Sequence, residues 1–296
     1  MKLRSKPHPA WGSGVARSRL WRLLQFLAVL LMANSSLTES GLAEPTPESV
    51  RGGRKLSLTI VYDNNSMRSD LRSEWGFSCV IEGLEKTVLF DTGGSSSALL
   101  ANMRTLGIDP LEIEVVVLSH VHRDHTGGLA GFLAVNNNVT VYMPASFPAS
   151  QKNGVRSAGA LLIEVDEPQR ILPGLYTTGQ MGNRIREQAV YIEARDGLVV
   201  ITGCAHPGVA RIAARANELG RQAPFLVAGG FHLIGSSRSA IERVIGRLKE
   251  LGITRTVPTH CTGDQARAMF SAAFGEGYDG RGLGAVITLD LTGYAK

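Results

Sequence analysis

Apolar and polar positions divide the chain from residue 56 onward into short strand-like runs and longer amphipathic stretches. β-branched or alternating segments predict strands at 56–64, 77–83, 86–94, 114–119, 189–194, 197–203, 224–230 and 284–291. Apolar positions with helical spacing predict helices at 97–106, 207–220 and 239–252, and another from about residue 264. Strands that alternate with helices are typical of a layered α/β domain.

The histidines are concentrated at the ends of these predicted strands. One of the seven, His8, lies near the N-terminus, and the other six lie in four short stretches flanked by Gly or Thr: His120, His122, His125, His206, His232 and His260. Layered α/β proteins gather their ligands at strand ends. We therefore expect the six histidines to contribute to one site.

Residues 1–43 have the pattern of a secretory signal peptide. Six basic side chains precede an eleven-residue apolar run at 23–33, and Gly41 and Ala43 provide small residues before a cleavage point. We expect a signal peptide over 1–43, a Pro/Glu/Gly linker over 44–54 and one folded domain over 55–296. The apolar run is too short to span a bilayer comfortably. The sequence thus predicts a periplasmic or secreted protein with no stable membrane span, with an uncleaved membrane anchor as the alternative.

The net charge of +5 comes from residues 1–43. The chain has 31 basic and 26 acidic residues, and removing the six basic and one acidic residue of 1–43 leaves 25 of each. A neutral body lacks the electrostatic footprint of a nucleic-acid-binding protein. We expect a small-molecule substrate and no nucleic acid, while the sequence indicates no oligomeric state.

The stretch LSHVHRDHTGGL, residues 118–129, has the spacing of a metal-binding loop. His120 and His122 share one face of an extended segment, and Asp124 and His125 follow where the chain turns. One short loop could therefore supply ligands to two divalent ions about 3.5 to 4 Å apart. At this chain's His and Asp frequencies, chance gives this spacing on the order of once in ten thousand chains. A solvated charged loop is the alternative.

The cysteines and Asp91 leave alternatives open. Cys204 and Cys261 each lie within two residues of a histidine, which favours site residues, with a disulfide between them as the alternative. Cys261 has the weaker claim to the site, and packing is expected for it. Asp91 lies in VLFDTGG, a pattern shared with pepsin-like proteases, but a single D-T-G lacks the second carboxylate that those enzymes need. We expect Asp91 instead to hold a ligand imidazole in its working tautomer.

Five motifs in order, FDTG, LSHVHRDHTGGL, ITGCAHPG, AGGFHL and THCTG, resemble those of the metallo-β-lactamase superfamily. Within it they are most similar to the branch that contains the dihydropterin ribofuranosylaminobenzene phosphate synthases. The resemblance covers roughly residues 56–293. It implies a single-domain, four-layer αββα sandwich with a two-metal site at one edge.

The resemblance also implies a ligand set. His120 and His122 would hold the first metal ion, and Asp124, His125 and His260 the second. Cys204 stands where many relatives have a bridging aspartate, and we expect His206 to replace a missing histidine of the first metal ion. A structural role in the Gly-Cys-Ala-His-Pro-Gly turn is the alternative for His206, and a lone buried cysteine is the alternative for Cys204.

Mixed nitrogen, carboxylate and thiolate ligands suit zinc first, with iron or manganese as alternatives. The main expectation is an exported metal-dependent hydrolase in which Asp124 orients a metal-activated water toward an ester, lactone or phosphoester. The first alternative is a transferase similar to the synthases, in which a pterin-methyl diphosphate loses diphosphate to an aryl-ribose phosphate. The second is an exported metal-binding protein without turnover. His232 is expected to contact substrate or support a ligand, and Arg184 or Arg186 to meet an anionic group.

Overall fold

The computed structural model describes residues 54–291. The predicted signal peptide, the linker except Arg54, and residues 292–296 lie outside the described residues. Within 54–291, no helix combines the length and apolarity that crossing a bilayer requires.

The first sheet is built mainly from the N-terminal part of the described chain. Its strands are β1 (Lys55–Asp63), β2 (Phe77–Glu82), β3 (Thr87–Phe90), β4 (Ile113–Val117), β5 (Thr140–Pro144), β6 (Leu161–Val165) and β13 (Val286–Asp290). They lie in the order β13-β1-β2-β3-β4-β5-β6. The strands from β3 to β6 run parallel, so their carboxyl ends lie at one edge.

The second sheet contains six strands from the C-terminal part. They are β7 (Gln169–Leu172), β8 (Leu175–Thr177), β9 (Val190–Ala194), β10 (Gly197–Thr202), β11 (Pro224–Gly230) and β12 (Arg255–Thr259). They lie in the order β12-β11-β10-β9-β8-β7, and β10, β11 and β12 run parallel.

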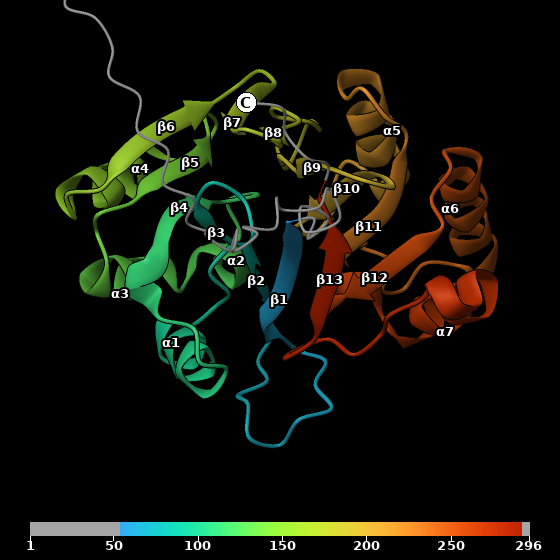
Figure 1. Cartoon of the computed structure of the whole chain (residues 1–296), viewed down its shortest axis with the longest axis horizontal. Coiled ribbons are helices and arrows are strands. Elements are labelled where there is room, and N and C mark those ends of the chain that lie inside the picture. Colours follow the sequence, from blue (N-terminus) through green and yellow to red (C-terminus); the bar gives the residue numbers. More distant parts are fainter. Residues whose placement is uncertain (1–53, 292–296) are drawn as a thin grey trace, which may run out of the picture. The chain divides into compact units, whose positions relative to one another are not determined.

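Helices cover the outer face of each sheet, as Figure 1 shows. The helices are α1 (Ser96–Thr105), α2 (Arg123–Thr126), α3 (Leu129–Val135), α4 (Ala149–Ser157), α5 (Val209–Leu219), α6 (Arg238–Glu250) and α7 (Asp264–Phe274). Residues of α1, α3 and α4 pack on the first sheet, and residues of α5, α6 and α7 pack on the second. The order of layers is therefore helix, sheet, sheet, helix.

The alternation of side chains along each strand explains this layering. In β10, Val199 and Ile201 face the core between the sheets, whereas Leu198 and Val200 face the helices. Because successive side chains point to opposite faces of a strand, an uninterrupted apolar run requires cover on both sides. Strands β10 and β11 are buried at every position for this reason.

The structure confirms the predicted α/β sandwich and most of its elements. The hairpin near Gly83 and Leu84 joins the antiparallel strands β2 and β3. Helix α6 buries Ile241, Ile245 and Leu248 along the predicted face. The elements between residues 140 and 177 were not predicted, because β6 to β8 are short and mostly lack a fully apolar run.

Candidate metal centre

The carboxyl ends of five strands deliver the side chains of the site. Strand β3 leads into Asp91, β4 into the segment Ser119–His125, and β10 into the turn Gly203–His206. Strand β11 leads into His232, and β12 into His260. Since the parallel strands of each sheet end at one edge, these loops from both sheets face one another.

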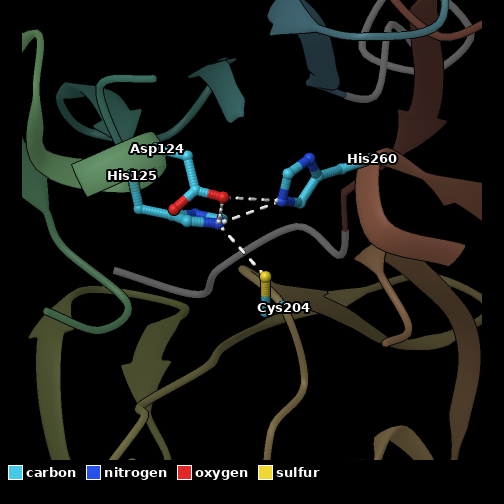
Figure 2. A group of neighbouring side chains, drawn as sticks. All are labelled: Asp124, His125, Cys204 and His260. Atoms are coloured by element: carbon cyan, nitrogen blue, oxygen red, sulfur yellow. Dashed lines mark hydrogen bonds and ion pairs between the residues drawn. The ribbon is translucent and has the colours of Figure 1, made fainter. Parts of the chain in front are cut away.

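Asp124, His125, Cys204 and His260 form the first group, drawn in Figure 2. Their ligand atoms all lie within 4.8 Å of one another. Nε2 of His125 lies 3.3 Å from Nε2 of His260 and 3.2 Å from Sγ of Cys204. Oδ2 of Asp124 lies 3.2 Å from Nε2 of His260. His125 and His260 are both buried, whereas the Asp124 carboxylate is partly exposed.

His120, Cys204 and His206 form the second group, with the same limit of 4.8 Å between ligand atoms. Nε2 of His120 lies 3.3 Å from Nε2 of His206 and 3.1 Å from Nδ1 of His122. The His122 ring also contacts that of His206, with centroids 4.9 Å apart. Cys204 belongs to both groups and therefore lies between them.

Hydrogen bonds fix the tautomer of His120 and His125 through Asp91. The buried Asp91 carboxylate accepts hydrogen bonds from Nδ1 of His125 and from the hydroxyl and backbone N–H of Ser119, each at 2.7 Å. The Ser119 hydroxyl uses its hydrogen for Asp91, so it accepts from Nδ1 of His120 at 2.9 Å. In their neutral forms both imidazoles thus donate through Nδ1 and leave Nε2 without a hydrogen.

Residues of β1 and the loop after it hold His260 in the same way. Nδ1 of His260 donates to Oδ1 of Asn64 at 2.8 Å, and the backbone N–H of His260 donates to Asp63 at 3.1 Å. In the neutral ring, Nε2 of His260 is therefore also free of hydrogen. The Trp75 ring covers the imidazole, with centroids 4.7 Å apart.

This donor set fits divalent cations. A tetrahedral ion with metal–nitrogen bonds of about 2.0–2.1 Å holds its ligand nitrogens roughly 3.3 Å apart, the separation found between His125 and His260. Facing nitrogens without a hydrogen repel one another unless a cation lies between them. Burial and neighbouring imidazoles hold the pKa of His120 well below its usual range, which keeps this ring neutral. Burial and the nearby His232 lower the pKa of His206 to about 4.

Acidic side chains favour positive charge in the first group, which contains Asp124 and His125. Burial lowers the pKa of His125, but the Asp91 carboxylate more than offsets this effect, and the pKa is raised. Partial burial raises the pKa of Asp124, but its interaction with the adjacent imidazoles of His260 and His125 outweighs that and leaves the pKa well below its usual range. A bound cation would satisfy the same charges.

The two cysteines of the site are reduced, so the disulfide alternative is wrong for this structure. Cys261, for which packing was expected, lies with Cys204 and His232 in a third group whose ligand atoms are within 4.8 Å of one another. A hydrogen bond from the Cys204 thiol lowers the pKa of Cys261. The His232 ring is exposed and lies 4.4 Å, between centroids, from that of His206.

Sequence reasoning missed Glu187, a buried carboxylate that shapes the turn carrying Cys204 and His206. Its Oε1 accepts backbone hydrogen bonds from Gly203, Cys204 and Ala205 at 2.8 to 3.2 Å, and its Oε2 accepts from the backbone N–H of His206 at 2.8 Å. The available signal was an acid just before the apolar run of β9. That signal is weak because acids commonly precede strands without such a role.

Backbone strain is concentrated at the same place. Among the described residues other than glycine, positive φ occurs at four positions, all in these loops: Asp91, Ala205, His232 and His260. Residues other than glycine rarely adopt a positive φ, and this conformation persists where the surrounding structure imposes it. The loops therefore hold their side chains in one arrangement.

The family model of the metallo-β-lactamase superfamily matches residues 76–260, and the chain belongs to this superfamily. A curated relative from Methanocaldococcus jannaschii is a 7,8-dihydropterin-6-methyl-4-(β-D-ribofuranosyl)-aminobenzene-5'-phosphate synthase. It is 28% identical over 278 residues, which cover 77% of this chain and 95% of the relative.

Solved structures share the fold, and Tm1679 and YhfI are two of them. Tm1679, a metal-dependent hydrolase of the β-lactamase superfamily, is 28% identical with a TM-score of 0.65, over 80% of this chain and 99% of its own. YhfI from Bacillus subtilis, a metallo-β-lactamase fold protein, is 16% identical with a TM-score of 0.58, over 78% of this chain and 99% of its own. The second likeness concerns the fold alone.

The comparisons correct the main functional expectation. A hydrolase was expected with the synthase as alternative, but a curated relative matched over 95% of its length is the synthase. The fold alone could not separate these activities, because one fold hosts many of them. The protease and charged-loop alternatives are also wrong: Asp91 is buried against His125 and Ser119, and His120 and His125 are fully buried.

Proposed function

We propose that the chain is a metal-dependent transferase of the synthase type. It would join a pterin-methyl group to an arylamine carrying a ribose phosphate, with loss of diphosphate. The observation that carries the proposal is the 28% identity to the M. jannaschii synthase across 95% of that protein. Four of the five motifs that resemble the synthase branch supply every residue of the three ligand groups.

The residues fit two divalent ions, for which zinc is the first choice. His120, His122 and His206 would hold one ion, Asp124, His125 and His260 the other, and Cys204 would contribute a thiolate between them. Bound ions would neutralise the negative charge that develops on a departing diphosphate.

The chain's own residues contribute orientation. Asp91, Ser119 and Asn64 fix the ligand imidazoles, so these rings need no rearrangement when a substrate binds. His232, exposed beside His206, lies where it can contact a bound substrate.

A direct assay tests the activity. Protein loaded with zinc should form the condensed product from a pterin-methyl diphosphate and an aryl-ribose phosphate, detected by mass spectrometry, with one diphosphate released per product. Replacing His125 with Ala should abolish both, and replacing the distant exposed Arg243 with Ala should change neither. Absence of product from metal-loaded, folded wild-type protein would refute the proposal.

Periplasmic or secreted location stays a prediction from residues 1–43. Cell fractionation and N-terminal sequencing of the mature chain would test it, and a chain that retains Met1 in the cytoplasm would exclude it.

A further inference from the structure

A polar cavity opens directly beside the metal centre, on the side of His206. Its volume is about 560 Å³, and its lining includes His206, Pro207, Arg184 and Arg211. The cavity and the second ligand group therefore share His206. A group bound in the cavity would be adjacent to any ion that this imidazole holds.

The charge of the cavity is entirely positive. Two arginines line it, and no carboxylate is among its lining residues. Both guanidinium groups belong to exposed residues, and neither forms an ion pair or hydrogen bond within residues 54–291. Arg215, on the same helix α5 as Arg211, is instead paired with Glu218. Unpaired guanidinium groups that face one cavity are free to bind an anion.

The loop that carries Arg184 is fixed to the metal centre. Met181 and Glu187 close it by two backbone hydrogen bonds of 2.8 and 3.0 Å. Gly182 has a φ of +88°, and a Cβ there would lie 2.7 Å from the carbonyl oxygen of Ile185, so the tight loop needs glycine. Glu187 also accepts the backbone N–H of His206. One buried residue thus sets the position of Arg184 relative to His206.

Arg211 reaches the cavity from a different element. It lies in the first turn of α5, which follows directly from the turn that carries His206. Guanidinium groups from two elements can bind a phosphate from two sides. Each guanidinium group offers a pair of N–H donors that matches two phosphate oxygens.

We propose that Arg184 and Arg211 form a subsite for a phosphate group of the substrate, next to His206. The phosphate comes either from the monoester of the acceptor or from the diphosphate leaving group, and the two share the same chemistry. The assignment of the phosphate to these substrates rests on the proposed transferase function, whereas anion binding by the cavity does not.

Calorimetric titration of the zinc-loaded full chain tests the subsite without turnover. The probes are phenyl phosphate, a monoester, and inorganic diphosphate. The double variant Arg184→Ala/Arg211→Ala should bind at least one probe about 10- to 100-fold more weakly, as expected for lost charged hydrogen bonds. The double lysine variant should recover part of the loss, because it keeps charge without the paired donors.

Arg215→Ala is the matched control, because it removes an arginine from α5 outside the cavity. It should leave both affinities within twofold of wild type. Weakening of the monoester alone identifies the acceptor phosphate, and weakening of diphosphate alone identifies the leaving group. The subsite is excluded if the double alanine variant binds both probes as wild type does, or if the control weakens them equally.

The two proposals can fail separately. If anion binding depends on the arginines but no condensation product forms, the subsite is supported and the transferase function is refuted. If the double alanine variant catalyses the condensation with wild-type kcat and KM, the transferase function is supported and the subsite is refuted.

Discussion

The carboxylate of Asp91 lies 2.7 Å from Nδ1 of His125, and this contact joins residues 34 positions apart. Asp91 directly follows β3, and His125 lies in α2, which follows the neighbouring parallel strand β4. The hydrogen bond leaves Nε2 of His125 pointing toward His260 and Cys204. Asp91 therefore orients the imidazole without reaching the centre itself.

Replacing Asp91 with Asn should lower metal affinity about 10- to 100-fold, as loss of such an orienting partner does. Asn tolerates the positive φ of 57° at this position, so the backbone should persist. Its amide cannot accept all three hydrogen bonds. Competition with a chromogenic chelator measures the affinity, and Asp70→Asn, an exposed carboxylate, is the control. Equal affinities for the two variants would contradict the role of Asp91.

Replacing Cys204 with Ser should remove thiolate coordination. In protein loaded with cobalt in place of zinc, the sulfur-to-cobalt charge-transfer absorption should disappear, because Cys204 lies 3.2 Å from Nε2 of His125. Cys79→Ala is the control, since Cys79 is buried in the core between the sheets. If the absorption persists in Cys204→Ser and vanishes in Cys261→Ser, the thiolate ligand is Cys261 instead.

Replacing Glu187 with Ala should destabilise the fold by about 3 to 5 kcal/mol, because it leaves four backbone N–H groups around the Gly203–His206 turn without their acceptor. Urea unfolding measures the change. Glu193→Ala, a less buried glutamate of the neighbouring strand β9, is the comparison and should cost distinctly less. Similar costs for both would show that the four hydrogen bonds contribute little.

Replacing Ile201 with Ala should cost about 2 to 5 kcal/mol of unfolding free energy. Ile201 is fully buried in the core between the two sheets. Val286→Ala, at an exposed position of β13, should change stability by no more than about 0.5 kcal/mol. Metal affinity measured on the folded Ile201 variant should stay near that of wild type, which separates packing from ligation.

Removal of metal should lower the thermal stability of the chain. An ion that binds only the folded state stabilises it by about 4 kcal/mol when its concentration is a thousand times Kd. Differential scanning calorimetry with EDTA and after addition of excess zinc measures the loss and its recovery. An unchanged Tm after verified metal removal would contradict a centre that joins the two sheets.

The sequence predicted the part of the site whose residues lie close together in the chain. His120, His122, Asp124 and His125 lie in one short loop, so their spacing alone indicates metal chemistry. His206, Cys204 and His260 could be placed through the family resemblance, and the structure brings them to the same point. The ligand roles of all these residues stay predictions.

Apart from Asp91, the residues that support the site could not be found this way. Asn64 meets His260 across 196 positions, and Glu187 meets the backbone of the Gly203–His206 turn 16 to 19 positions away. Such contacts depend on the tertiary fold and leave no periodicity or spacing in the chain. The short strands β6 to β8 were missed for a related reason, since neighbouring strands stabilise them more than their own residues do.

Nε2 of His125 and Nε2 of His260 are separated by 3.3 Å in space and by 135 positions in the chain. An ion held by both would act as a reversible cross-link that closes this long loop, much as a disulfide does, and long loops gain most from closure. The three cysteines remain unpaired among the described residues. With an ion as the cross-link, the stability of the fold would depend on the metal supply and would be insensitive to thiol reductants.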